Sequence, residues 1–182
     1  HLEHIRMTFS ILRDNQLFVK KSKCSFGVQQ IEYIGHVISA KRVSTDPSKI
    51  HAMVRWPRPS NHKELRSFLG LTGYYRRFIQ HYSNTCRPLH DVLKSEKFSW
   101  NSDAEGAFTN LKSALTSAPV LALSNFAEEF VIETDASGNG VEAVLMQKGR
   151  PLAYMSKTLS SRNLALSAYE KEMLAMVMAV QK

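Results

Sequence analysis

The spacing of apolar residues divides the chain into regions of different predicted structure. Apolar residues recur every three or four positions from 2 to 12, which predicts an N-terminal helix. Residues 17–38 are rich in β-branched and aromatic side chains and predict a small hairpin or meander. The helical period returns from residue 46 and gives way to strand-like segments from residue 130. The pattern therefore predicts a helical middle between two β-rich regions.

Capping residues and prolines set the ends of the predicted helices. Asp46 followed by Pro47 is a helix-start signal, because the first residue can cap and the second suits the first helical position. Ser167 with Glu170 matches a capping box. After the N-terminal helix, the predicted helices cover residues 46–56, 62–80, 88–94, 102–118 and 167–182.

Three strands are predicted near the C-terminus. They are FVIETD at 130–135, GVEAVLMQ at 140–147 and PLAYMSK at 151–157, with glycine-containing turns between them. Strands joined by such short turns form an antiparallel meander. The predicted fold class is therefore α+β, with a mostly helical middle and a three-stranded antiparallel sheet packed on the last helix.

Composition and charge narrow the classes of partner. Hydrophobic residues make up 43% and charged residues 22%, as in folded globular proteins. No apolar run approaches the roughly 18 residues of a membrane span. Residues 1–99 hold 17 Lys and Arg against 7 Asp and Glu, whereas residues 100–182 hold 7 against 9. A basic half suggests a surface that binds nucleic acid, and the alternative is an ordinary solvated surface.

One face of the predicted helix at 62–80 combines cations with glycines. A glycine inside a helix costs about 1 kcal/mol relative to alanine, so two of them need a reason. They could admit a nucleic-acid groove between flanking cations, or they could let a second helix pack closely. Tyr74 lies beside this face and is free to stack on a base, whereas Tyr75 falls on the core stripe. The residues of this face are Lys63, Arg66, Gly70, Gly73 and Arg77.

Two carboxylates are candidates for a metal site. Asp135 ends a predicted strand, where a rigid sheet would hold it, although aspartate before a glycine-rich turn is also common. One carboxylate rarely holds Mg²⁺ alone, so a partner is required. Glu172 shares a helix face with small residues that can lie near the sheet, whereas Glu170 is explained by the capping box.

The order of short motifs resembles a known family. In chain order they are HLEHIRMTFSIL, KCSF, YIGHVIS, DPSKI, WPRP, LRSFLGLTGYYRRFI, APVL, ETDAS and YEKEMLA. Together they resemble a central piece of a Ty3/Gypsy-type retrotransposon polyprotein, where the end of reverse transcriptase joins the start of ribonuclease H. The resemblance covers essentially the whole chain.

The resemblance implies a division into four parts. Residues 1–45 look like the end of the palm with the primer-grip hairpin, 46–95 like the helical thumb, 96–127 like the tether, and 128–182 like the N-terminal half of a ribonuclease H-like domain. In the primer grip, Tyr33, Gly35 and His36 would contact nucleic acid. The thumb helix would track the minor groove of the template–primer with Lys63, Arg66, Gly70, Gly73, Tyr74 and Arg77.

The resemblance also implies a chemistry. Asp135 of ETDAS and Glu172 of YEKEMLA match the first two catalytic, metal-binding carboxylates of ribonuclease H. The family hydrolyses the RNA strand of an RNA–DNA hybrid with two Mg²⁺ ions, for which Mn²⁺ can substitute. The polymerase aspartates and the later ribonuclease H carboxylates fall outside this sequence. The metal is therefore expected to be weakly held, and the chain is expected to be an inactive fragment of an RNA-directed DNA polymerase and ribonuclease H.

Two departures from the family pattern leave an alternative open. Glu142 and Arg42 stand where the pattern usually has glycine, which fits a non-catalytic nucleic-acid-binding or structural remnant of a decayed element. The expected partners are an RNA–DNA hybrid or a DNA template–primer and the rest of the polyprotein, with no membrane. The expected location is a cytoplasmic virus-like particle, with the DNA product destined for the nucleus. The oligomeric state stays open.

Overall fold

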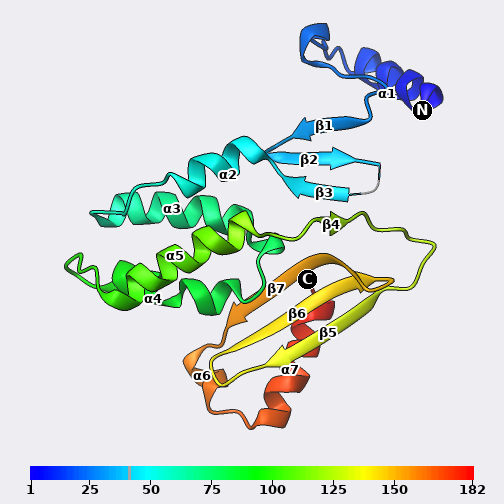
Figure 1. The fold of residues 1–182 in the computed structure, drawn as a ribbon. Helices are drawn as coiled ribbons and strands as arrows, with labels where there is room; N and C mark the ends of the chain where they lie inside the picture. The colour runs from blue at the N-terminus through cyan, green and yellow to red at the C-terminus, as the bar shows by residue number, and fades with distance from the viewer. Residues whose placement is uncertain (41) are drawn as a thin grey trace.

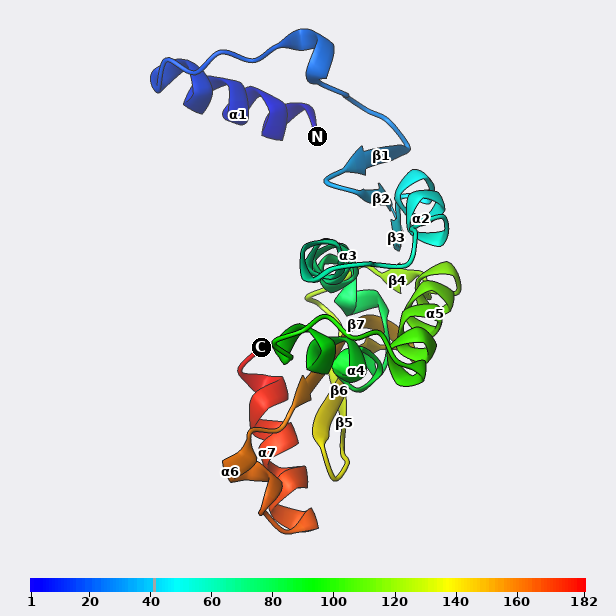
Figure 2. The ribbon, with the colours of Figure 1, turned by 90° about the vertical axis from the view of Figure 1, so that its left-hand side faces the viewer.

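The computed structural model describes residues 1–40 and 42–182, and it is elongated (Figure 1). A quarter turn of the view shows α1 at one end, the helices α2 to α5 in the middle and α7 at the other end (Figure 2). In the described residues, no helix has the length and apolar character needed to cross a membrane. The helices are α1 (Leu2–Asp14), α2 (Pro47–Val54), α3 (His62–Tyr74), α4 (Tyr82–Lys94), α5 (Ser102–Thr116), α6 (Ser161–Leu164) and α7 (Ala168–Val180), with 3-10 turns η1 (Lys21–Lys23) and η2 (Arg76–Phe78). The strands are β1 (Gln30–Tyr33), β2 (His36–Ser39), β3 (Arg42–Thr45), β4 (Leu121–Ala122), β5 (Val131–Ala136), β6 (Gly140–Gln147) and β7 (Arg150–Thr158).

The predicted N-terminal helix is confirmed as α1, which stands apart from the other helices in both views. None of its residues is buried, although Leu2, Met7 and Ile11 are large and apolar. Phe9 makes an edge contact with Phe26, at 6.0 Å between ring centroids. The apolar spacing therefore predicted the helix correctly, although no residue of α1 is buried in a core.

The first sheet contains four short antiparallel strands in the order β1-β2-β3-β4. The predicted hairpin is confirmed for β1 and β2, which pair through Tyr33 and His36. It was wrong for residues 17–29, which hold only the 3-10 turn η1. Arg42 is the first residue of β3 and pairs with Ala122 of β4.

The helices α2 and α3 begin where their caps predict. The Asp46 carboxylate accepts a hydrogen bond from the Ser48 amide at 2.8 Å, and the Asn61 side chain accepts one from the Glu64 amide at 2.9 Å. The predicted end of α3 and the predicted start of α4 were wrong. The helix α3 ends at Tyr74 rather than near residue 80, and α4 begins at Tyr82, so that Pro88 lies inside it. The turn η2 and the left-handed backbone of His81 separate the two helices.

One large core holds these helices together, and we call residues 46–118 the helical lobe. Its buried side chains come from α2, α3, η2, α4 and α5, with Leu121 of β4 at its edge. Phe68 and Phe108 pack with ring centroids 4.6 Å apart. The helix α5, from the segment that the sequence assigned to the tether, thus shares a core with the helices assigned to the thumb.

The C-terminal lobe, residues 131–182, has the predicted three-stranded antiparallel sheet in the order β5-β6-β7. The predicted capping box of Ser167 and Glu170 starts α7. This helix packs on one face of the sheet, and Val141, Leu159 and Ala175 are buried between them. The α+β fold class is therefore confirmed.

The two lobes meet where the start of α4 lies against β6 and β7. The Ser83 amide donates to Ser156 Oγ at 2.6 Å. Asn84 Nδ2 donates to Glu142 Oε1 at 3.1 Å, and His81 Nδ1 contacts Oε2 of the same carboxylate. Glu142 therefore links the C-terminal sheet to the helical lobe.

Candidate nucleic-acid interface and carboxylate pair

One face of α3 presents two cations and a bare stretch of backbone. Lys63, Arg66 and Gly70 are all exposed, and the opposite face of the helix is buried in the core. A Cβ added to Gly70 would meet nothing within 4 Å. Close packing against another helix therefore does not explain Gly70, which lies on an open surface.

The second glycine of this face has a different role. A Cβ on Gly73 would lie 3.3 Å from Tyr82 Oη, so Gly73 lets α3 approach α4 closely. The Tyr82 hydroxyl also lies 2.9 Å from Thr72 Oγ1 in the core, and burial raises the pKa of Tyr82 to about 12. The sequence left two explanations open for the glycine pair. Close helix packing explains Gly73, whereas Gly70 lies on an open surface.

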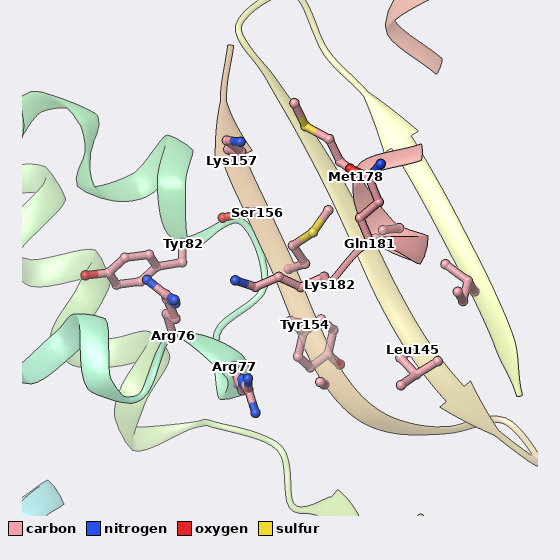
Figure 3. Close-up of a pocket in the computed structure, with 15 residues that line it drawn as sticks. Arg76, Arg77, Tyr82, Leu145, Tyr154, Ser156, Lys157, Met178, Gln181 and Lys182 are labelled. Atoms are coloured by element: carbon pink, nitrogen blue, oxygen red, sulfur yellow. The ribbon is translucent and has the colours of Figure 1, made fainter. Parts of the chain in front are cut away.

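Arg77 is not on the α3 face. The predicted spacing assumed a continuous helix to residue 80, but Arg77 lies in η2 after α3 has ended. It lines a cavity of about 600 Å³ together with Arg76, Lys157 and Lys182. Figure 3 shows the arginines on the side of the helical lobe and Lys182 above the sheet. The cavity floor is apolar, with Ile132, Ala143, Leu145, Ala153 and Met155 from the sheet and Met178 from α7.

The turn between β1 and β2 carries the three residues expected in the primer grip. The Tyr33 side chain is 59% exposed and therefore accessible to a partner. Gly35 has φ +72°, and a Cβ on it would lie 2.7 Å from Tyr75 Oη. His36 is half-buried, and burial lowers its pKa, which favours the neutral ring.

Tyr74 is engaged within the chain but stays 46% exposed, so its stacking on a base remains a prediction. Its hydroxyl donates to the Ile34 carbonyl, and its ring stacks on His36 with centroids 5.3 Å apart. Its neighbour Tyr75 is buried as predicted, and donates to the Gly35 carbonyl at 2.9 Å. Sequence reasoning missed that both tyrosines hold the turn, because these bonds join residues 40 positions apart.

The two candidate carboxylates come from the same end of the C-terminal lobe. Asp135 is exposed near the end of β5, and Glu172 is half-buried in the second turn of α7, three residues before the buried Ala175. Lys171 Nζ donates to the Gly138 carbonyl at 3.5 Å, which ties the start of α7 to the turn after β5. Strand alternation, however, gives Asp135 the opposite face from Ala136, which packs toward α7.

On its own face, Asp135 lies among other polar side chains. It lines a cavity of about 190 Å³ with Glu133, Glu142, Gln80 and His81, whereas Glu172 does not line it. Asp135 and Glu142 are cross-strand partners. His81 and Asn84 contact the Glu142 carboxylate, which lies beside Asp135. The helical lobe therefore lies close to the candidate catalytic residue.

The chemistry of these ligands suits Mg²⁺ only in part. Carboxylate oxygens are the ligands that Mg²⁺ prefers, and an ion held by two of them completes its shell with water and substrate phosphates. Within residues 1–40 and 42–182, no group of three or more His, Cys, Asp or Glu side chains is placed to hold a metal. Asp135 and Glu172 together supply ligands for at most one such ion, and they could share it only at the end of the sheet, because Asp135 faces away from α7.

Comparison with known sequences finds relatives among transposon polyproteins. A family model described as an RNase H-like domain found in reverse transcriptase matches residues 100–182. The chain is 38% identical over 183 residues to the retrovirus-related Pol polyprotein from transposon 297 of Drosophila melanogaster, covering all of the chain and 17% of that protein. It is 35% identical over 187 residues to the transposon Tf2-3 polyprotein of Schizosaccharomyces pombe, covering 14% of that protein. An uncharacterized mitochondrial protein of Arabidopsis thaliana is 47% identical over 132 residues, which is 71% of the chain and 84% of that protein.

Solved structures share the fold. The foamy viral protease-reverse transcriptase in complex with an RNA/DNA hybrid superposes with a TM-score of 0.86 at 24% identity, over 99% of this chain and 25% of that one. The same viral protein in complex with double-stranded DNA gives a TM-score of 0.84 at 24% identity, over 100% of this chain and 39% of that one. The chain thus spans between about a seventh and a sixth of the transposon polyproteins that it matches.

Proposed function

The chain belongs to the reverse transcriptase–ribonuclease H family of retrotransposon polyproteins, and from this premise we propose that it grips a template–primer or RNA–DNA hybrid. In this proposal the helical lobe acts as the thumb and the turn at residues 33–36 as the primer grip. The C-terminal lobe supplies the first carboxylates of a ribonuclease H site. Polymerisation and hydrolysis belong to a longer protein.

The exposed face of α3 is the observation that carries this proposal. Lys63 and Arg66 place two charges on a surface where Gly70 leaves the helix backbone bare. Phosphates attract the cations, and the missing side chain lets a groove edge approach the helix. Such contacts bind a duplex without reading its sequence.

The proposed hydrolytic role rests on Asp135 and Glu172. When a Mg²⁺ ion is bound, it supplies charge stabilisation and an activated water for hydrolysis of a phosphodiester. Asp135 would contribute to holding that ion from β5 and Glu172 from α7, and the ion would lie at the end of the sheet, where the turn after β5 meets the start of α7. A second ion needs further carboxylates, because two close dications repel strongly.

A non-catalytic gripping role is the second candidate. It is favoured by Glu142, whose carboxylate beside Asp135 is bound to His81 and Asn84 of the helical lobe. This contact fixes the sheet to the helical lobe, which a binding module needs as much as an enzyme does. Hybrid cleavage by a longer protein that contains these residues would decide against this candidate.

Replacing Gly70 with leucine tests the proposed grip. We expect Gly70→Leu to weaken binding to a fluorescent hybrid about tenfold in an anisotropy titration. The same change should stabilise the free protein by up to about 1 kcal/mol, because leucine is a better helix former than glycine and nothing lies within 4 Å. Opposite changes in affinity and stability would show that Gly70 serves a partner.

Gly106→Leu is the matched control. Gly106 is also helical and exposed, in α5, and its Cβ would meet nothing within 4 Å. It should gain stability without losing affinity. Equal affinity of the two variants would contradict the proposed interface, and unfolding of Gly70→Leu would show that Gly70 is needed for packing.

A further inference from the structure

The turn between β1 and β2 has a backbone conformation that its sequence does not favour. Ile34 has φ +46° and Gly35 has φ +72°, between the paired residues Tyr33 and His36. A two-residue hairpin turn with two positive φ angles normally takes Asn-Gly or Asp-Gly. A β-branched residue such as Ile34 is a genuine outlier in that region. Something outside the turn must therefore hold it.

Two tyrosine hydroxyls at the end of α3 supply that hold. The Tyr74 hydroxyl donates to the Ile34 carbonyl, and the Tyr75 hydroxyl donates to the Gly35 carbonyl at 2.9 Å. The Asp46 amide donates to the same Gly35 carbonyl at 3.0 Å. Both carbonyls of the strained dipeptide thus have partners outside the turn.

The residue after the turn is held by the same group of side chains. The His36 ring stacks on Tyr74 and on Phe78, with centroids 5.3 and 5.4 Å apart and planes tilted by 17° and 22°. Tyr75 meets it edge-on at 5.6 Å. A Cβ on Gly35 would lie 2.7 Å from Tyr75 Oη, so the contact also requires glycine at this position. The turn and the end of α3 are therefore packed as one unit.

We propose that Tyr74 and Tyr75 are positioning residues that fix the nucleic-acid-facing turn to the cationic helix α3. The inference rests on the proposed function, since it assigns the turn to the end of the primer and α3 to the duplex behind it. From Lys63 to Tyr74, α3 rises about 16 Å, which matches about five base pairs of a duplex. The two tyrosines would thus set the register between the primer end and the duplex contacts.

Hydrogen exchange of the free protein tests the hold itself. The variants Tyr74→Phe and Tyr75→Phe, alone and together, keep both rings and remove only the hydroxyls. One hydrogen bond is worth about a fivefold factor in a local opening equilibrium, so we expect exchange across residues 30–39 about twentyfold faster in the double variant. Tyr169→Phe is the control, because Tyr169 is exposed on α7, away from the turn. Unchanged exchange across residues 30–39 would overturn the proposal.

A second experiment tests the positioning role on nucleic acid. The probe is 2-aminopurine placed in a template–primer either at the primer 3′ end or five base pairs upstream. We expect the double variant to lose the fluorescence change at the 3′ end, to keep the upstream change, and to bind within about threefold of the original affinity. A merely structural defect would reduce both signals together, and that result would overturn the proposal, as would two unchanged signals.

The two experiments separate this inference from the function on which it rests. If the original protein changes neither probe signal, the proposed grip on the template–primer is wrong. The exchange measurement needs no nucleic acid, so it then decides alone whether the tyrosines hold the turn. Faster exchange with no probe response would leave the two hydroxyls as fold-stabilising groups and overturn their positioning role.

Discussion

The helical lobe and the C-terminal lobe have very different cores. In the helical lobe, large side chains from four helices pack around Phe68 and Phe108. In the C-terminal lobe, the buried cluster is Val141, Leu159 and Ala175, and part of the sheet face lines an open cavity. A sheet with so small a core draws stability from its neighbour, and the contacts at Glu142 and Ser156 supply it.

Substitutions in each of the two cores should have the largest effects on stability. Phe68 is fully buried, so Phe68→Ala should cost about 3–5 kcal/mol and unfold both lobes. Val141→Ala should cost about 2 kcal/mol and loosen the C-terminal lobe alone. Trp56 and Trp100 both pack with the helical core, so tryptophan fluorescence in urea reports that lobe, and hydrogen exchange reports the sheet. Loss of the tryptophan transition in Val141→Ala would contradict the asymmetry.

Alkaline pH should destabilise the helical lobe more than the C-terminal lobe. Each of two buried groups in the helical lobe should lower its free energy of unfolding by about 3 kcal/mol when it ionises. Burial raises the pKa of Tyr82 to about 12 and that of Cys86 to about 11, from ordinary values of 10.0 and 9.0. The folded state holds these protons more tightly, so their contribution is complete below pH 9 and is lost as the pH rises to about 12. Tryptophan fluorescence should show unfolding of the helical lobe in this range. In Cys86→Ala, the pH range over which stability falls should narrow to that set by Tyr82. An unchanged dependence of stability on pH would show that the Cys86 thiol does not contribute.

Weakening the Glu142 contacts between the lobes should have a smaller effect on stability, confined to the sheet. Glu142→Gln removes the carboxylate charge that faces His81 while keeping a side chain that can accept from Asn84. We expect a loss of about 1 kcal/mol in the stability of β5–β7, measured by hydrogen exchange. The control is Lys148→Ala, which breaks an exposed ion pair with Glu128 and should cost less than half as much. Equal effects would show that the Glu142 contacts are worth no more than an ordinary surface pair.

The weakest expected effect is metal binding by the C-terminal lobe. Asp135 and Glu172 should hold one Mg²⁺ ion with millimolar affinity, seen as chemical-shift changes at β5 and α7. Asp135→Asn should remove these changes. The 182-residue chain should not cleave an RNA–DNA hybrid, because two carboxylates poorly offset the charge of two dications. Cleavage that disappears in Asp135→Asn would show that fewer carboxylates suffice.

Local patterns predicted much of the fold. The alternating segments after residue 130 and their glycine turns gave the C-terminal sheet, and Asp46 and Ser167 marked helix starts that the structure confirms. Pairing between distant segments was not predictable. The strands β3 and β4 join Val43 to Leu121 and leave no periodic signal in either segment. Pro88 misled the prediction of α4, because proline usually marks a helix start and here lies inside one.

The candidate site shows the same division between local and distant information. The face of Lys63, Arg66 and Gly70 follows from helical spacing alone, and the structure leaves all three exposed. Arg77 left that face because α3 ends at Tyr74, which the apolar stripe did not reveal. The engagement of Tyr74 with Ile34 depends on a contact across 40 residues. Spacing therefore identified the cationic face, whereas only the structure showed what holds the turn beside it.

The salt dependence of duplex binding measures how many phosphates the cationic face of α3 neutralises. Each phosphate neutralised on B-form DNA contributes about −0.9 to the slope of log affinity against log salt. Replacing Lys63 and Arg66 together with alanine should make this slope shallower by about two units, whereas Lys148→Ala, which removes a charge from the other lobe, should leave it unchanged. That result would establish the face of α3 as the nucleic-acid interface. An equal slope for the original protein and the double variant would show that the α3 cations are only solvated.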